Sequence, residues 1–316
     1  MIKKKAFTML ELVMVIVILG IVSSIGADII TKLYENYIKT RAINRLQAQT
    51  DLILDQIAKR LEFRIKDSVI ARNDQVFLDF VALTDANESY DVLEWIGRDN
   101  ESFLGSWDGV SNTPGWSGFI DLDSNETDRN VTGINDNWLK SIGSRFDFAS
   151  ATINALSNNQ VDMIQGSALQ KPVILFKGKS SYNLAGGYGW RADGNHTFEH
   201  RVFFPAGKTD VLEFIDTPPT EIYEQYNLAW SAYALRAVPV NAANNDYNLT
   251  LSYNYQPWYS ERYDQNTTST QVLAQNVSTF RFRQIGETIR IKLCIHDNNQ
   301  TAMDFDFSFC KERVIY

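Results

Sequence analysis

The chain has 316 residues, a formal net charge of −8 and a pI near 5.0, so it is long enough for one large domain or two smaller ones. An acidic chain does not attract phosphate backbones, which argues against nucleic acid as a direct partner. The two cysteines are too few to form a zinc-finger site.

The N-terminal stretch MIKKKAFTMLELVMVIVILG places three lysines before an apolar run. Residues 7–27 carry one charge, Glu11, and a helix needs about 20 residues to cross the hydrocarbon core of a membrane. The lysines predict a cytoplasmic N-terminus and an exported remainder. A secretory signal cut near residues 25–27, or a plain signal anchor, also begins with basic residues followed by an apolar run. Neither explains Glu11, because a carboxylate inside a membrane span is costly and usually functional.

The motif around Glu11, KKKAFTMLEL at residues 3–12, resembles the class III leader of type IV pilins and type II secretion pseudopilins. The resemblance implies cleavage by a prepilin peptidase between Ala6 and Phe7, N-methylation of Phe7, and Glu11 at the fifth mature position. This chain has Ala6 where the family normally has glycine. In a filament, the Glu11 carboxylate would pair with a neighbour's Phe7 amine, which offsets the cost of burying both charges and fixes the axial register.

The same helix is expected to continue beyond the membrane to about Arg72. No glycine or proline interrupts residues 27–72, and apolar side chains recur every four residues from Ile53 to Val69. Residues 7–27 are apolar on all sides, whereas residues 28–72 form an amphipathic stalk. A helix over residues 7–72 would be about 100 Å long.

Residues 73–316 change to short β-type runs between polar loops, which predicts an exported domain built on an antiparallel sheet. Residues 99–137 are expected to form a long decorated loop, and residues 140–156 a short helix. The chain is thus predicted to have an α+β fold, with the long helix packed on the sheet as in pilins. The expected strands are Val76–Leu83, Val92–Ile96, Val173–Phe176, Phe198–Phe204, Val211–Phe214, Tyr226–Val238, Leu249–Tyr255, Phe280–Gln284, Thr288–Ile295 and Phe305–Phe309.

Two further segments narrow the resemblance. The stretch QVLAQNVSTFRFR at residues 271–283, followed by Thr288–Ile295, is similar to the C-terminal strands of J-type minor pseudopilins and W-type minor type IV pilins. The helical stretch LILDQIAKRL at residues 52–61 also resembles that subgroup. Membership of this subgroup implies a place in a tip complex with other minor subunits.

Cys294 and Cys310 lie in strand-like runs on either side of the polar residues 297–301. An antiparallel hairpin would bring them together, and an exported domain lies where disulfides persist. Closing a loop of about 15 residues would contribute about 3 kcal/mol in the entropic model. Two unpaired buried thiols are the alternative.

Residues Asp121, Asp123 and Asn125 place oxygen-bearing side chains at alternate positions, as at the beginning of a calcium loop. The glycine at position six and the glutamate at position twelve are missing, and Thr132 stands at the latter. Calcium is therefore the one cofactor that the sequence suggests.

A second pattern competes for the same residues. Asp-x-Asn-x-Ser/Thr resembles the extended sequon of bacterial periplasmic N-glycosylation, which predicts surface glycans. Asn100 and Asn276 fit the shorter sequon without the aspartate. The alternative is loop composition, because these residue types all favour turns. The seven extended sequons, all expected in loops, are centred on Asn87, Asn125, Asn130, Asn195, Asn248, Asn266 and Asn299.

No catalytic constellation is present in the sequence, so we expect no enzymatic activity. His196 and His200 read as parts of one strand, about 13 Å apart, which is too far to share a metal ion. The chain contains no nucleophile elbow and no P-loop. Trp107, Trp116 and Trp138 could contact a sugar or a surface, or could be core residues.

These features predict a minor pilin or pseudopilin at or near the tip of a type II secretion pseudopilus, priming assembly and supporting protein export. It would cross the inner membrane once, with a periplasmic head. The resemblance implies other minor and major pilins, the prepilin peptidase and the inner-membrane assembly platform as partners. A type IV or competence pilus serving adhesion or DNA uptake, and an adhesin presented on a stalk, remain alternatives. Cleavage of the leader would remove three lysines and change the net charge from −8 to −11. This charge argues against direct DNA binding.

Overall fold

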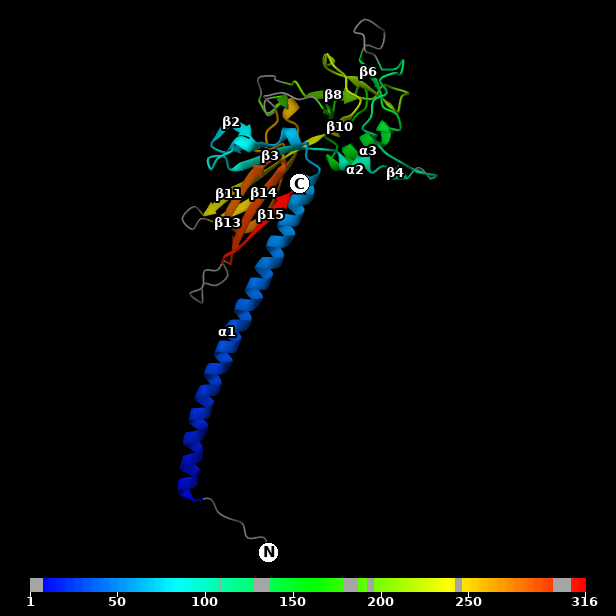
Figure 1. Ribbon diagram of the computed structural model, residues 1–316. Helices are drawn as coiled ribbons and strands as arrows, with labels where there is room; N and C mark the ends of the chain where they lie inside the picture. Colours follow the sequence, from blue (N-terminus) through cyan, green and yellow to red (C-terminus); the bar gives the residue numbers. More distant parts are fainter. Residues whose placement is uncertain are drawn as a thin grey trace.

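The computed structural model describes residues 8–107, 109–127, 137–178, 187–191, 196–241, 246–297 and 308–316. A long helix, α1 (Met9–Glu62), forms a rod with a β-rich head at one end (Figure 1). The predicted α+β fold, a long apolar helix followed by an antiparallel sheet domain, is confirmed.

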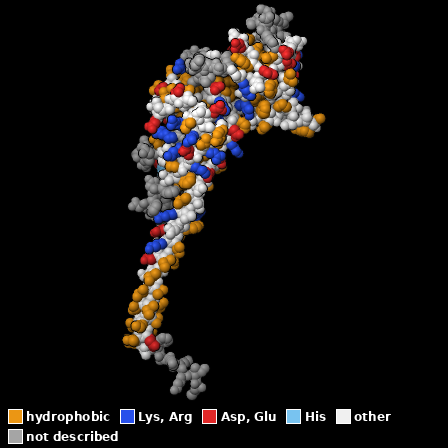
Figure 2. All heavy atoms as spheres, in the orientation of Figure 1, with side chains coloured by type: hydrophobic (Ala, Val, Ile, Leu, Met, Phe, Trp, Pro, Cys, Tyr) orange, Lys and Arg blue, Asp and Glu red, His pale blue; other side chains and the backbone are white. Residues whose placement is uncertain are grey.

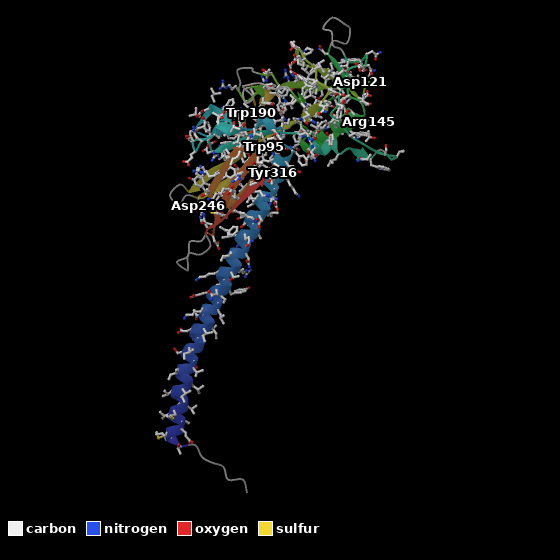
Figure 3. All side chains as sticks on the ribbon, in the orientation of Figure 1. Trp95, Asp121, Arg145, Trp190, Asp246 and Tyr316 are labelled. Carbon is white, nitrogen blue, oxygen red and sulfur yellow. A yellow bond between two sulfur atoms is a disulfide. The ribbon has the colours of Figure 1, made fainter. Side chains whose placement is uncertain are left out.

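Helix α1 ends at Glu62, so the prediction that it reaches about Arg72 is wrong. Its 54 residues correspond to about 80 Å. The chain leaves the helix because Arg64 makes tertiary contacts instead: its backbone forms a β-bridge with Gly97. Its buried guanidinium donates hydrogen bonds to the carbonyls of Leu61 (2.6 Å) and Tyr316 (3.2 Å). Figure 3 shows Tyr316 beside this end of α1.

The predicted apolar stripe nevertheless stays buried after the helix ends. Ile65 and Val69 flank a short 3-10 helix, Lys66–Ser68, and both remain in the core. The first strand, β1 (Ile70–Asn73), follows directly. Burial at four-residue spacing therefore indicated which side chains are covered, but not where the helix ends.

The first sheet has eight strands in the order β15-β14-β13-β12-β11-β3-β1-β2, each pair antiparallel. The upper half of α1 covers one face, where its Leu46, Ile53, Leu54, Ile57 and Leu61 are buried with the leucines of the sheet. The remaining bounds of these strands are β2 (Val76–Ala82), β3 (Val92–Gly97), β11 (Ser231–Asn241), β12 (Asp246–Tyr255), β13 (Ser269–Ile285), β14 (Thr288–His296) and β15 (Ser308–Ile315).

The segment that forms a second sheet is inserted, in sequence, between two strands of the first sheet. Strands β3 and β11 are paired neighbours, yet residues 98–230 lie between them in sequence. This insertion forms a second lobe with a five-stranded antiparallel sheet, β10-β7-β8-β9-β6, which projects to one side of α1 (Figure 1). Its strands and helices are α2 (Asn100–Phe103), β4 (Ser106–Trp107), β5 (Asn112–Thr113), β6 (Trp138–Lys140), α3 (Phe146–Leu156), β7 (Val173–Phe176), β8 (Glu199–Phe203), β9 (Val211–Phe214) and β10 (Tyr226–Ala229).

Several predicted boundaries change as a result. The run Tyr226–Val238 is two strands, because β10 belongs to the second sheet and β11 to the first, with Trp230 between them. The loop predicted at residues 99–137 contains α2 and the β4–β5 hairpin. The helix predicted over 140–156 begins at Phe146, and β15 extends the last predicted strand to Ile315, while residues 305–307 of that prediction lie outside the described residues.

Candidate functional site: the N-terminal assembly helix

The lower half of α1 has large apolar side chains that the chain itself leaves uncovered. Between Met9 and Leu33 these side chains are 48% to 87% exposed. Figure 2 shows them as a nearly continuous apolar surface on the rod. Within the described part of the chain, α1 is the one helix long and apolar enough to cross a membrane. This half of α1 is thus long and apolar enough for a membrane anchor, and its apolar surface is left for lipid or other proteins to cover.

Glu11 lies in the first turn of this helix and forms a capping box with Thr8. The Thr8 N–H and hydroxyl both donate to Glu11 Oε2 at 2.9 Å, and the Glu11 N–H donates to Thr8 Oγ1 at 3.4 Å. Such a box satisfies backbone donors that the first turn of a helix leaves free. The carboxylate also lies at the end of the helix dipole that favours negative charge.

The capping box gives Glu11 a partner within its own chain, so the carboxylate does not depend on a neighbour in order to be hydrogen-bonded. Thr8 is the functional residue that the sequence interpretation missed, although the pattern Thr8-x-x-Glu11 is the signature of this cap. Ala6, Phe7 and the three lysines lie outside the described residues. Cleavage after Ala6, methylation of Phe7 and its pairing with Glu11 therefore remain predictions.

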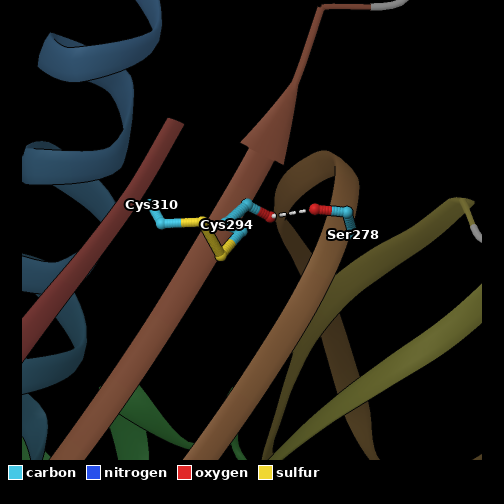
Figure 4. The surroundings of a disulfide bond; sticks show 3 residues. All are labelled: Ser278, Cys294 and Cys310. Atoms are coloured by element: carbon cyan, nitrogen blue, oxygen red, sulfur yellow. Dashed lines mark hydrogen bonds between the residues drawn. A yellow bond between two sulfur atoms is a disulfide. The ribbon is translucent and has the colours of Figure 1, made fainter. Parts of the chain in front are cut away.

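The upper half of α1 is held by the C-terminal strand. Lys311 and Arg313 of β15 pair with Asp51 and Asp55 of α1, the latter at 2.9 Å. Cys294 of β14 and Cys310 of β15 face each other in the ladder and are joined by a disulfide, as the hairpin argument predicted (Figure 4). The bond therefore links β15, the strand that pairs with α1, to its neighbour β14.

Three of the predicted sequons, Asn87, Asn125 and Asn266, are exposed in turns, where a glycan has room. The expectation that all seven lie in loops is wrong for Asn248, which is half-buried in β12 opposite Val238. The strand begins earlier than predicted because residues 246–248 pair with β11. Asn130, Asn195 and Asn299 lie outside the described residues. Of the shorter sequons, Asn100 begins α2 and Asn276 lies within β13.

At the calcium candidate, the side chain of Asp121 accepts the backbone N–H of Asp123 at 3.0 Å, as in a turn, and the side chains of Asp123 and Asn125 are exposed. Figure 3 shows Asp121 in the second lobe. The nearby Glu126 carboxylate binds Lys140 at 2.7 Å and also Lys208, which lowers its pKa. No group of three His, Cys, Asp or Glu side chains in the described residues could hold a metal ion. Calcium binding at this loop stays a prediction.

The histidine and tryptophan candidates occupy different environments. His200 lies in β8, whereas His196 precedes it and pairs with Glu199, whose hydrogen bond raises the pKa of His196. Trp116 is buried in the core of the second lobe, while Trp107 is 66% exposed on the β4–β5 hairpin. Trp138 is half-buried, and its indole N–H donates to Glu213. The three tryptophans therefore do not form one exposed patch.

Comparison with known proteins identifies the N-terminal segment. Residues 1–27 match the prokaryotic N-terminal methylation motif, which is the class III prepilin leader. The chain therefore begins as type IV pilins and pseudopilins begin, with Phe7 and Glu11 inside the matched segment. No curated protein and no solved structure matches the chain.

Proposed function

We propose that the chain is a minor pilin or pseudopilin of the J or W type, a structural subunit without enzymatic activity. It would lie at or near the tip of a type II secretion pseudopilus, where it primes assembly and supports protein export. The observation that carries this proposal is the exposed apolar half of α1 with Glu11 at its beginning, within a matched methylation motif. A surface of this kind suits a membrane before assembly and a bundle of like helices afterwards.

The mechanism follows from charge and burial. Cleavage between Ala6 and Phe7 leaves a positive amine one residue before the Thr8–Glu11 cap. In a bundle of apolar helices, a neighbour's amine would enter beside the Glu11 carboxylate, which Thr8 already holds in place. An unpaired charge in that environment is strongly unfavourable, so the pair forms at one axial register only.

A terminal position is supported by the shape of the head. The mature chain would have 310 residues once six are removed from 316, which is large for a repeating subunit. The second lobe projects to one side of α1 (Figure 1). Such an overhang would obstruct heads stacked above it in a continuous filament, whereas the last subunit has no neighbour above.

A second candidate is a minor pilin of a type IV or competence pilus, or an adhesin presented on the stalk. The β4–β5 hairpin favours it, because Leu104, Trp107 and Val110 are exposed there by 64% to 86%. Adjacent genes for a secretion pore and further pseudopilins would favour secretion.

We also propose that some of the extended sequons carry glycans, with Asn87, Asn125 and Asn266 as the accessible candidates. A single measurement tests this and the processing of the leader: the intact mass of the native protein. We expect loss of residues 1–6, gain of one methyl group, and additional sugar masses in some molecules. A full-length, unmethylated chain would contradict the pilin proposal. A single mass for the mature chain without sugar would contradict glycosylation alone.

A further inference from the structure

One side of the upper half of α1, which meets the second lobe at its upper end, carries only positive charges. Side chains three or four residues apart share one face of a helix. The charged members of this face are the exposed Arg41, Arg45, Lys59 and Arg60. The carboxylates Asp51, Asp55 and Glu62 lie on the adjacent side, where Asp55 and Glu62, four and three residues from Lys59, border this face. The positions that make up the face are 41, 45, 49, 52, 56, 59, 60 and 63.

A cavity of about 320 Å³ lies where the upper end of this face meets the segment after β3. Gln56, Lys59, Arg60 and the C-cap residue Phe63 line it from the end of α1, and Arg98 and Glu101 line it from the other side. Three cationic side chains thus surround a space that contains one carboxylate.

These cations are held by aromatic rings and not by carboxylates. Arg60 lies over the ring of Tyr233, and Arg98 lies between the rings of Phe63 and Phe103, at 5.3 to 5.9 Å from the ring centres. Within the described chain, no ion pair joins Arg60, Arg98 or Lys59 to an acid. The Arg98 Nε is buried without a hydrogen-bond partner. A buried donor of this kind costs free energy until an acceptor arrives.

We propose that this cationic face, defined as Arg41, Arg45, Lys59 and Arg60 of α1 together with Arg98, binds the acidic face of an α-helix from a different subunit. The inference rests on the proposed function in so far as the partner is a filament subunit. The face is about 33 Å long from residue 41 to residue 63. A partner helix with the same rise per residue can match its charges along that whole length.

The charges also argue against a second copy of this chain as the partner. Two copies packed face to face would oppose cations to cations, which is destabilising. Of the three α1 carboxylates beside this face, Asp51 and Asp55 are already paired with β15, which leaves Glu62 alone against four cations of α1. The cationic face therefore selects a neighbour of different sequence.

The test uses the full-length protein in non-ionic detergent micelles and a labelled, alanine-based helical peptide with glutamates on one face. A peptide of the same composition with its glutamates spread around the helix is the control probe. By fluorescence anisotropy at low salt, we expect the one-faced probe to bind about tenfold more tightly. Added salt should weaken this binding because it screens exposed charges.

The double variant Lys59→Glu with Arg98→Glu should lose about tenfold in affinity for the one-faced probe. The matched control, Arg281→Glu with Arg283→Glu, reverses two exposed cations on β13 and should change it by less than about twofold. Gln56→Trp fills the cavity without changing a charge and should also weaken binding. Loss of binding in this second variant would show that the effect of the charge variant is not due to misfolding alone.

Equal binding of the two probes, or equal loss in the β13 control, would overturn the proposal. Self-association of the wild-type chain that the Lys59 and Arg98 variant abolishes would assign the face to a second copy and also overturn it. Both outcomes are independent of the mass measurement, so the pilin proposal can stand if this one fails.

Discussion

The two halves of α1 form one continuous helix, but only the upper half has its apolar side chains covered by the rest of the chain. In the upper half, Ile57 and Leu61 are at most 1% exposed because the first sheet covers them. In the lower half, Ile18 and Leu19 are 57% and 58% exposed because nothing in the chain covers them. The apolar surface of the upper half is therefore covered within one molecule, whereas that of the lower half is left for lipid or other subunits to cover.

The difference separates folding from assembly. Substitutions of the buried apolar side chains in the upper half should change the stability of the head, whereas substitutions in the lower half should change only insertion or assembly. Glu11 is in the lower half, and its capping box shows that a single chain can satisfy it before a neighbour is present.

The largest expected effect distinguishes two leucines on the same helix. Leu61→Ala should lower the free energy of unfolding of the head by about 2–5 kcal/mol, because it empties a fully buried position. The matched Leu19→Ala should change it by less than about 0.5 kcal/mol. Urea unfolding of the detergent-solubilised protein, followed by tryptophan fluorescence, measures both. Similar losses in the two variants would remove the distinction between the halves.

A somewhat smaller effect is expected from the disulfide, which secures the strand that covers the upper half. Replacing Cys294 and Cys310 by alanine should cost about 3 kcal/mol, because the bond closes a loop with a sequence separation of 16. Membrane insertion should not change, since the lower half does not contact these strands. Reduction of the wild-type protein is the control and should give the same loss. Native cysteines that react with maleimide before reduction would contradict the bond.

Much of this architecture could be predicted from the sequence, because local patterns specify it. Val173–Phe176 and Val211–Phe214 were predicted with their observed bounds, since short apolar runs between turn residues indicate buried strands. The pairing of Cys294 with Cys310 followed from hairpin geometry. The leader motif and Glu11 were recognisable because charge inside an apolar span is rare.

The parts that could not be predicted depend on distant contacts. Helix α1 ends at Glu62 because Arg64 bonds to Gly97 and Tyr316, which no local pattern reveals. The insertion of the second lobe between β3 and β11 is likewise a matter of long-range pairing. At the site, Thr8 has a local signature in the pattern Thr8-x-x-Glu11, whereas the cavity beside Arg98 has none.

The central claim is that Glu11 serves assembly and not anchoring or folding. Its most direct test compares Glu11→Ala with Asp28→Ala, another exposed carboxylate of α1, in cells that assemble the filament. We expect both variants to enter the membrane normally and only Glu11→Ala to be absent from sheared filaments. Incorporation of Glu11→Ala at the wild-type level would contradict it.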